Sequence, residues 1–460
     1  MKYAAYESYE PSESVWLDQL PSHWQQLRVK HVIERMESGV SVNSDASPAN
    51  NEEIGVLKTS CVYGDQFSPQ ENKRVLEEEI ERVACPVKAN RLIISRMNTP
   101  ELVGSCGYVD HDFPNLYLPD RLWQTVFSKS RECSPKFAWY YLTSRPAKSA
   151  ISSLAAGTSG SMQNIAQDAF VGIGFPLPPL DEQQTIARFL DAKTAQIDAL
   201  VAQKRQLIDK LKEKRQALIA RTVTRGLPPE AAKAAGLEPN PEMKDSGVEW
   251  LGEIPAHWKA TRLKYAASKI IDCPHDTPQY DPSGSYCVVR TADLDSGTLD
   301  LSRAYRVDES EYIHRIRRAK VLPSDILYSR EGERWGQAAI VPLEPIICLG
   351  QRMMQFRANT RFAPKFLMWH LSARCVYEQG ELDAAGSTAP HVNVETIRNY
   401  QLVEPPLAEQ VAIATFIDDQ MVKLDSLSGQ ILDAITRLTE YRQALVTSAV
   451  TGKIDVRELV

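Results

Sequence analysis

Two long stretches of the chain carry apolar residues at steps of three, four and seven positions, which is typical of an amphipathic helix. The first stretch, residues 181–225, contains neither Pro nor Gly. Matched apolar stripes predict that the two helices pack on each other as a coiled coil; the alternative is that each stripe covers a separate core. The two stripes are Ile186, Leu190, Ile197, Leu200, Leu207, Leu211 and Leu218, and Ile413, Ile417, Leu424, Leu427, Ile431, Leu438 and Leu445.

The regions before the two helices have a mixed pattern instead. Runs rich in β-branched and aromatic residues at 92–95, 123–127 and 326–329 predict strands. Residues 137–142 and 366–371 each follow a Pro-Lys step, and they predict buried helices with Pro in the first turn. Each region therefore combines strands with short helices.

The chain repeats this pattern once. The offset between the copies drifts only from 234 residues (16 to 250) to 227 residues (183 to 410), so the period is that of a duplicated domain with its connector and not of a solenoid. Three anchors recur in the same order: residues 16–24 as 250–258, Ser95-Arg96 as Ser329-Arg330, and Pro-Pro-Leu-x-Glu-Gln at 178–183 as 405–410.

These observations predict the fold class α+β. We expect two similar mixed α/β domains separated by two long antiparallel helices that form a coiled coil, with a pseudo-twofold internal repeat. A Pro-rich linker turns the chain back, which lets the helices run antiparallel. The predicted boundaries are 1–180 for the first domain, 181–225 for the central helix, 226–249 for the linker, 250–405 for the second domain and 406–460 for the C-terminal helix.

Composition narrows the class of protein. The 460 residues carry a formal charge of −6, which argues against coating a polyanion by bulk charge but leaves room for local basic faces. No run of about 18 apolar residues is present, so no transmembrane helix is expected. Eight Cys without a Cys-x-x-Cys pair favour reduced thiols and a cytoplasmic protein over a disulfide framework or a zinc site.

Catalytic motifs are missing from the sequence. There is no Gly-x-x-x-x-Gly-Lys-Ser/Thr phosphate loop, no His-Glu-x-x-His metal motif and no Gly-x-Ser-x-Gly elbow. Pro178-Pro179 and Pro405-Pro406 are followed by Leu, where an amino-methyltransferase site would carry an aromatic residue to stack on the target base. The sequence therefore favours a binding protein without catalytic residues or a metal site.

Arg residues near strand ends and small polar loops are the candidate nucleic-acid contacts. The planar guanidinium of Arg can bond phosphates and guanine edges, and Gly-rich polar loops allow close approach. The alternatives are solvated surface charges and ordinary turns. The candidates are Arg91, Arg96, Arg121, Thr158, Ser159, Ser161, Gln163 and Asn164 in the first copy, and Arg290, Arg330, Arg334, Arg352, Ser387, Thr388, His391 and Asn393 in the second.

The first long helix also ends in a basic stretch. Residues 204–225 contain eight Lys or Arg against two acidic residues, Asp209 and Glu213. This stretch could face DNA phosphates or an acidic partner, or it could be the solvated flank of a coiled coil.

The anchors resemble the specificity subunits of type I restriction-modification enzymes. The resemblance is carried by Trp-Leu…Pro-x-His-Trp at 16–24 and 250–258, by the Ser-Arg steps, and by Pro-Pro-Leu-x-Glu-Gln entering each long helix. It covers nearly the whole chain. The second copy (Leu251-Gly-Glu-Ile-Pro255) is closer to the family pattern than the first (Leu17-Asp-Gln-Leu-Pro21).

The resemblance implies a function. Each domain would be a target recognition domain that reads one part of a split, asymmetric DNA sequence, and the helices would set the spacing between the parts. The subunit would be non-catalytic. It would direct adenine methylation by two modification subunits, which bind S-adenosylmethionine, and DNA cleavage by restriction subunits, which use ATP and Mg.

The sequence leaves two other functions open. A coiled-coil scaffold or adaptor would bind only proteins, and its activity would survive removal of the basic residues Arg330, Arg334 and Arg352. A self-sufficient enzyme would transfer methyl groups as a purified chain, against the absence of catalytic motifs.

Overall fold

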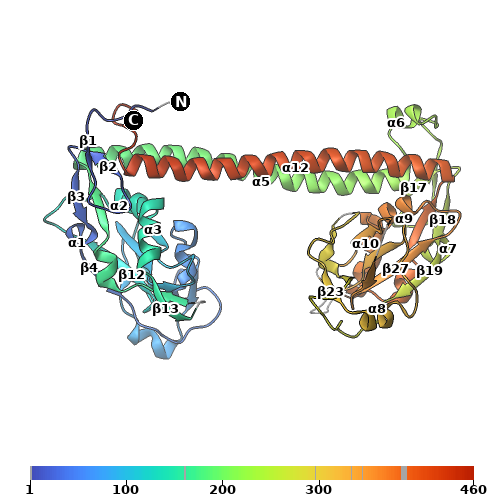
Figure 1. Ribbon diagram of the computed structural model, residues 1–460, viewed down its shortest axis with the longest axis horizontal. Helices are drawn as coiled ribbons and strands as arrows, with labels where there is room; N and C mark the ends of the chain where they lie inside the picture. Colours follow the sequence, from blue (N-terminus) through green and yellow to red (C-terminus); the bar gives the residue numbers. More distant parts are fainter. Residues whose placement is uncertain are drawn as a thin grey trace. The chain divides into compact units, whose positions relative to one another are not determined.

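The computed structural model describes residues 3–159, 162–295, 297–332, 334–343, 346–384 and 391–459. The chain divides into two compact units, the first formed by Met1–Lys204 with Asp433–Val460 and the second by Arg205–Leu432. Each unit contains one sheet-rich domain and a part of each of two long helices, α5 (Leu180–Arg225) and α12 (Leu407–Val450) (Figure 1).

The domain of the first unit is built on an antiparallel four-stranded sheet with the order β10-β8-β12-β4. A second sheet, β6-β5-β11-β7, contains one parallel pair, and small sheets complete the domain. The strands are β1 (Tyr9–Pro11), β2 (Gln19–Pro21), β3 (Gln25–Arg28), β4 (Ile33–Ser38), β5 (Gly55–Leu57), β6 (Asn72–Arg74), β7 (Pro86–Val87), β8 (Arg91–Ser95), β9 (Met97–Asn98), β10 (Cys106–Val109), β11 (Phe113–Tyr117), β12 (Leu122–Phe127), β13 (Ala156–Ser159), β14 (Met162–Asn164) and β15 (Gly174–Leu177). The helices are α1 (Val29–Val32), α2 (Pro135–Leu142), α3 (Arg145–Leu154) and α4 (Gln167–Val171), with 3-10 turns at Thr59–Asp65 and Glu77–Arg82.

The second unit repeats this topology. Its four-stranded sheet has the order β19-β27-β24-β25, and its next sheet, β23-β20-β26, again contains one parallel pair. The strands are β16 (Met243–Asp245), β17 (Glu253–Pro255), β18 (Lys259–Arg262), β19 (Ala267–Asp272), β20 (Tyr286–Val289), β21 (Leu294–Asp295), β22 (Thr298–Leu299), β23 (Tyr305–Val307), β24 (Ile326–Ser329), β25 (Ala338–Ile340), β26 (Ile347–Leu349), β27 (Met353–Ala358) and β28 (Gln401–Glu404). The helices are α6 (Pro229–Ala234), α7 (Leu263–Ala266), α8 (Glu309–Ile316), α9 (Pro364–Leu371), α10 (Arg374–Ala384) and α11 (Val394–Arg398), with a 3-10 turn at Thr291–Asp293.

The helices predicted after each Pro-Lys step are confirmed as α2 and α9. Pro135 and Pro364 stand in the first turn, where no amide hydrogen is needed, and Ser134 caps α2 by accepting a hydrogen bond from the Phe137 amide. Both helices bury most of their side chains against the four-stranded sheet and the adjoining long helices. The strands predicted at 92–95, 123–127 and 326–329 are likewise confirmed, as β8, β12 and β24.

The long helices pair in an antiparallel manner within each unit. In the first unit Arg442 Nε of α12 lies 2.9 Å from Asp198 Oδ1 of α5, and in the second Arg215 Nη1 of α5 lies 2.5 Å from Asp425 Oδ1 of α12. The repeat relates the two pairs, because residues 442 and 425 follow residues 215 and 198 by 227 positions. The predicted fold class, with similar mixed domains and two long antiparallel helices, is confirmed.

The predicted apolar stripe is confirmed only in part. Most of its residues are buried, but Leu200, Leu207 and Leu427 are 46%, 44% and 41% exposed. On α5 the buried positions proceed from Ile197 by a step of four to Val201, so Leu200 lies one position off the face that packs. A seam reconstructed from Leu and Ile alone therefore missed the smaller Val at the interface.

The C-terminal helix is shorter than the predicted range 406–460. Helix α12 ends at Val450, and Gly452 adopts a φ of +69°, a conformation that stops a helix. The following residues form turns and a bridge between Asp455 and Ala4, so both chain ends lie together in the first unit. No helix among the described residues is long and apolar enough to cross a membrane.

Candidate nucleic-acid interface

Each domain is fixed to its long helix by the Glu-Gln step of the repeated motif. Gln183 Oε1 accepts a hydrogen bond from the Ser134 amide, and its Nε2 donates to the carbonyl oxygens of Glu132 and Pro178. Gln410 makes the same three bonds one repeat later. Both side chains are fully buried, so the motif serves to hold the domain at a set angle on the helix start.

The preceding glutamates bind the repeated histidines. His23 Nε2 lies 2.8 Å from Glu182 Oε2, and His257 Nε2 lies 2.9 Å from Glu409 Oε2. In the first unit Glu182 also accepts bonds from the Tyr6 hydroxyl and from Trp24 Nε1. Burial and the bond to Glu182 raise the pKa of Tyr6 well above its ordinary value.

The candidate interface of the first domain is the region where β8 ends. The amide of Arg96 donates to the Arg121 carbonyl at 3.1 Å, and the amide of Ile165 donates to the Arg96 carbonyl at 3.0 Å. Strand β14 pairs with β9, which places Gln163 opposite Asn98. We call residues 96–103, Arg121 and 162–165 loop site 1.

The second domain builds the same backbone frame where β24 ends. The amide of Arg330 donates to the Arg352 carbonyl at 3.1 Å, and the amide of Val392 donates to the Arg330 carbonyl at 3.3 Å. A β-bridge pairs Glu331 with His391. In the first domain the equivalent pair is Met97 of β9 with Asn164 of β14. We call residues 330–332, 334–335, Arg352 and 391–393 loop site 2.

Each loop closes on a glycine that no other residue could replace without strain. The amide of Gly104 donates to the Ser95 carbonyl and that of Gly336 to the Ser329 carbonyl, at 2.7 and 2.8 Å. Their φ angles are +75° and +84°. A Cβ would lie 2.3 Å from Ile151 of α3 or 2.7 Å from Tyr377 of α10.

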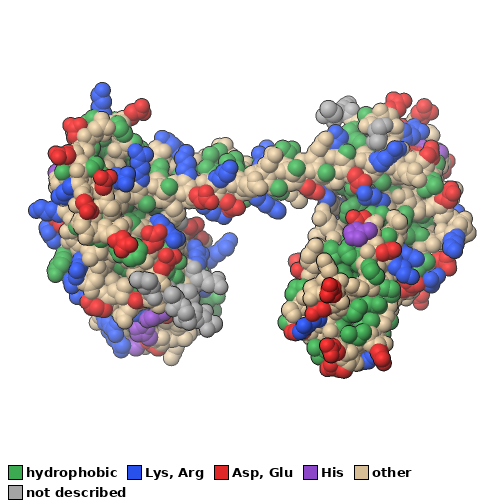
Figure 2. Space-filling model, turned by 180° about the vertical axis from the view of Figure 1, so that it is seen from behind, with side chains coloured by type: hydrophobic (Ala, Val, Ile, Leu, Met, Phe, Trp, Pro, Cys, Tyr) green, Lys and Arg blue, Asp and Glu red, His purple; other side chains and the backbone are tan. Residues whose placement is uncertain are grey.

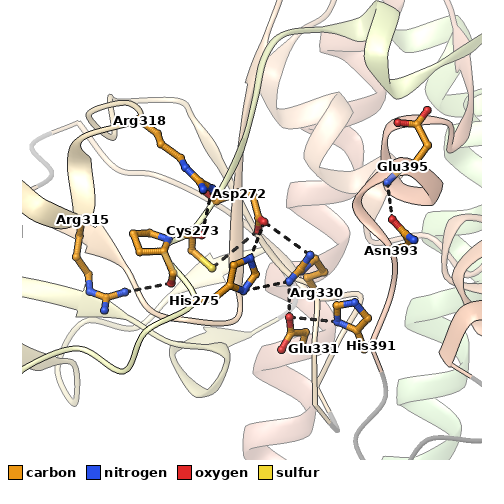
Figure 3. A network of polar contacts seen from close by, with 11 residues as sticks. Asp272, Cys273, His275, Arg315, Arg318, Arg330, Glu331, His391, Asn393 and Glu395 are labelled. Carbon is orange, nitrogen blue, oxygen red and sulfur yellow. Dashed lines mark hydrogen bonds and ion pairs between the residues drawn. The ribbon is translucent and has the colours of Figure 1, made fainter.

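The side chains of loop site 2 form a charged network (Figure 3). The buried guanidinium of Arg330 bonds to Glu331 and lies 3.8 Å from Asp272 Oδ2. His275 Nε2 bonds to Asp272 Oδ2 at 2.9 Å, and His391 Nδ1 lies 3.2 Å from Glu331 Oε1. The carboxylates of Asp272 and Glu331 therefore balance the charge of Arg330. Each carboxylate also contacts a half-exposed histidine, His275 or His391.

The corresponding side chains of loop site 1 are mostly neutral. The guanidinium of Arg96 lies 6.0 Å from the centre of the Trp123 ring. Asn98 donates from Nδ2 to the Tyr63 hydroxyl at 3.1 Å. One backbone frame thus presents amide and aromatic groups in the first domain and an ionic network in the second.

The structure brings most of the candidate residues together. Arg96, Arg121, Gln163 and Asn164 converge on loop site 1. On loop site 2 converge Arg330, Arg334, Arg352, His391 and Asn393.

Two candidates lie elsewhere. Arg91 stands at the opposite end of β8, where its Nη1 donates to the Thr125 carbonyl. Arg290 is ion-paired with Asp293 at 2.9 Å and stacks 3.7 Å from the Tyr305 ring centre. Its 3-10 turn borders loop site 2, because Arg334 donates to the carbonyls of Ala292 and Leu294.

Some candidates cannot be placed in full. Thr158 and Ser159 lie on β13, but their side chains fall outside the described part of the chain. Ser161, Ser387 and Thr388 lie outside the described residues altogether.

Sequence reasoning missed Asp272, His275, Tyr63 and Asn98. None of them belongs to a repeated anchor, and Asp272 and His275 lie more than 50 residues before Arg330 in the chain. The available signal was the alignment of Asp272, at the end of β19, with Ser38, at the end of β4. In each domain this strand belongs to the same four-stranded sheet as the strand that ends in the Ser-Arg step. A carboxylate at the end of β19 could therefore have been expected near Arg330.

The face of the molecule drawn in Figure 2 carries basic and acidic side chains interspersed over the surface of each domain. Such a mixture matches the net charge of −6. Binding of nucleic acid by either domain would therefore depend on particular loops more than on a broad basic field.

Comparisons with known proteins agree with this organisation. The family model "Type I restriction modification DNA specificity domain" matches residues 21–210 and 274–437. The EcoBI specificity subunit of Escherichia coli is 25% identical over 67% of this chain and 64% of its own length, so this chain spans about two thirds of that relative. The EcoKI specificity subunit of Escherichia coli strain K12 is 22% identical over 89% of this chain and 82% of its own length.

A solved structure shares the fold. A chain determined in a study of complex assembly and conformational transition of the type I R-M system superposes with a TM-score of 0.66 at 15% identity, over 95% of this chain and 99% of that one. Together with the family model, which matches each half of the repeat, these similarities identify the family: this chain belongs to the specificity subunits of type I restriction-modification systems.

Proposed function

We propose that each domain reads one part of a split, asymmetric DNA sequence through its loop site. The chain itself is non-catalytic and cytoplasmic. It directs adenine methylation by two modification subunits and cleavage by restriction subunits, with S-adenosylmethionine, ATP and Mg bound to those partners.

One observation carries this proposal: the two loop sites share their backbone hydrogen bonds and differ in their side chains. A shared frame presents contacting groups at equivalent positions, and unlike groups at those positions select unlike base edges. Two different readers on one scaffold fit an asymmetric target. An adaptor that bound two copies of one protein would need two similar surfaces instead.

The test uses the chain expressed with its modification partner in a host that lacks DNA methylation. Single-molecule sequencing of the host DNA should show methylated adenines in one motif of two specified parts separated by unspecified bases. Arg121→Gln in loop site 1 and Arg352→Gln in loop site 2 are matched variants, because both side chains are exposed and occupy equivalent positions. Each should relax the specificity of one part, by about 1–3 kcal/mol if the Arg contacts a base.

Three results would contradict the proposal. Methylation without a split motif would show that the domains do not read sequence. Equal effects of both variants on both parts would show that the loop sites do not act separately. Methyl transfer by the purified chain alone would show that it is an enzyme.

A further inference from the structure

The basic end of helix α5 contains an ordered row of positive charges. Two of its basic residues are already ion-paired within the chain: Arg215 pairs with Asp425 of α12, and Lys212 pairs with Asp209. Lys210, Lys214, Arg221 and Arg225 are all exposed, and none of them makes an ion pair with another described residue. We call these four residues the basic stripe.

The four residues share one face of the helix. Their spacing of 4, 7 and 4 positions places them within an arc of roughly 60° at about 100° per residue. The stripe is about 22 Å long at about 1.5 Å per residue. The acidic residues Asp209 and Glu213 lie to one side of this arc, so no carboxylate of α5 interrupts the row.

Packing of the helix pair does not explain the stripe. Helix α5 meets α12 through Arg215 and buries Leu211 and Ile219 on the same side, roughly 110° around the helix from the stripe. The stripe therefore points away from the helix pair's own interface.

The repeat supplies an internal comparison. In α12 and the turn after it, the positions equivalent to the stripe are Arg437, Tyr441, Ser448 and Gly452. Only one of the four is charged, although that helix pairs in the same way. The charges are thus a property of the second unit and not a requirement of the paired helices.

We propose that the basic stripe binds the sugar–phosphate backbone of double-stranded DNA and adds sequence-independent affinity to the second unit. This inference rests on the proposed function, since it assumes that the loop sites bind DNA. A row of Lys and Arg on a straight helix suits the regular charges of a duplex, whereas protein interfaces are depleted in Lys and are built around apolar or aromatic anchors. An exposed apolar side chain, Leu207, lies one turn before Lys210 on the same face, so loss of a protein partner is measured as an alternative outcome.

The chain offers a matched control on the same helix. Arg205 and Lys212 are also exposed, but they lie on the opposite side of α5 from Lys210 and Lys214. The variants Lys210→Gln/Lys214→Gln and Arg205→Gln/Lys212→Gln remove equal charge, and Gln preserves helix propensity. A fourfold variant with Arg221→Gln and Arg225→Gln added removes the whole stripe.

The measurement is the dissociation constant of the full chain, assembled with its modification subunits, for a labelled duplex between 50 and 200 mM salt. Each phosphate contact contributes about 0.9 to the slope of log affinity against log salt. The double stripe variant should lower the slope by about 2 and the fourfold variant by about 3 to 4, for cognate and unrelated duplexes alike. The control variant should leave the slope unchanged, and the methylated motif should stay the same throughout.

Two outcomes would overturn the inference, and a third would refute the proposed function instead. Equal slopes for stripe and control variants would make the stripe a solvated flank. Unchanged DNA binding with loss of a modification subunit on gel filtration would make it a site for an acidic protein. Failure of the unsubstituted complex to prefer any sequence would instead refute the proposed function, which is a separate result.

Discussion

Loop site 1 and loop site 2 have the same main-chain bonds but hold their central arginines in different ways. Arg96 is half-buried against the Trp123 ring, whereas Arg330 is buried between two carboxylates. A single arginine on a ring can be exchanged with little effect on its surroundings. An arginine between carboxylates cannot, because its loss leaves like charges facing each other. The comparison indicates that the domain carrying the ionic network tolerates less change at its central arginine.

The largest effect should follow from breaking that network. Arg330→Met should destabilise the second unit by about 3 kcal/mol, because Asp272 and Glu331 lose their shared cation. Arg96→Met should cost the first unit less than about 1 kcal/mol, the scale of a cation–π contact. Hydrogen exchange followed by mass spectrometry would report each unit by its own peptides. Similar losses in both units would show that the two arginines are held equally.

A second pair of variants tests what the two units share. Gln183→Leu and Gln410→Leu each remove three hydrogen bonds to the main chain from a buried site. Both should cost about 2 kcal/mol, because buried main-chain groups lose partners. The same hydrogen-exchange measurement applies. A cost in only one unit would mean that the Glu-Gln motif is structural in one copy alone.

Lowering the pH should destabilise the second unit more than the first. Burial lowers the pKa of His370 to about 4, and its Nε2 accepts a bond from the Val403 amide at 3.2 Å. Because the folded pKa lies below the unfolded value of about 6.5, protonation favours the unfolded chain, and stability is lost as pH falls from about 6.5 towards 4. The second unit should lose about 2 kcal/mol between pH 7 and pH 5 from this group.

The first unit provides the control for this pH effect. Tyr141 occupies the position equivalent to His370, and it donates from its hydroxyl to the Gly174 carbonyl at 2.7 Å. Burial raises the pKa of Tyr141, so it stays neutral at any acidic pH. His370→Gln should flatten the pH dependence of the second unit measured by urea unfolding. An unchanged pH profile in that variant would exclude His370 as its source.

The smallest effect concerns a bond that only the first unit makes. Tyr6→Phe removes the hydroxyl that donates to Glu182 at 2.6 Å, and it should cost the first unit about 1 kcal/mol. Among the described residues of the second unit, His257 is the hydrogen-bond partner of the Glu409 carboxylate, and Trp258 Nε1 is buried without a hydrogen bond. Tyr441→Phe, which removes only a solvent-exposed hydroxyl contact with Tyr3 at 3.4 Å, is the control. A shift of the second unit's peptides would contradict the assignment.

The repeat made much of the fold predictable. Its anchors are residues with buried structural bonds, such as Gln183 and Gln410, and such bonds recur because both domains meet a helix in the same way. Helices α2 and α9 were predictable from Pro-Lys because Pro suits the first turn. The exposure of Leu200 was not predictable from residue type. The position of a residue around the helix decides whether it is buried, and the smaller Val201 holds the buried position instead.

The candidate site was less predictable. The Ser-Arg steps located both loop sites, because they stand where strands end. The charges around Arg330 were not found, since Asp272 and His275 come from another strand and the loop that follows it. Arg91 lies at the end of β8 opposite loop site 1, which the residue types around it could not reveal.

The matched ion pairs of the long helices limit how this protein can change over time. Seventeen positions separate 198 from 215, and seventeen separate 425 from 442. An inserted residue in one helix alone would shift its partners by about 1.5 Å and turn them by about 100°, which breaks one pair or the other. Equal insertions in both helices keep both ion pairs in register, whereas an insertion in one helix alone costs about 1 kcal/mol or less at a partly exposed pair.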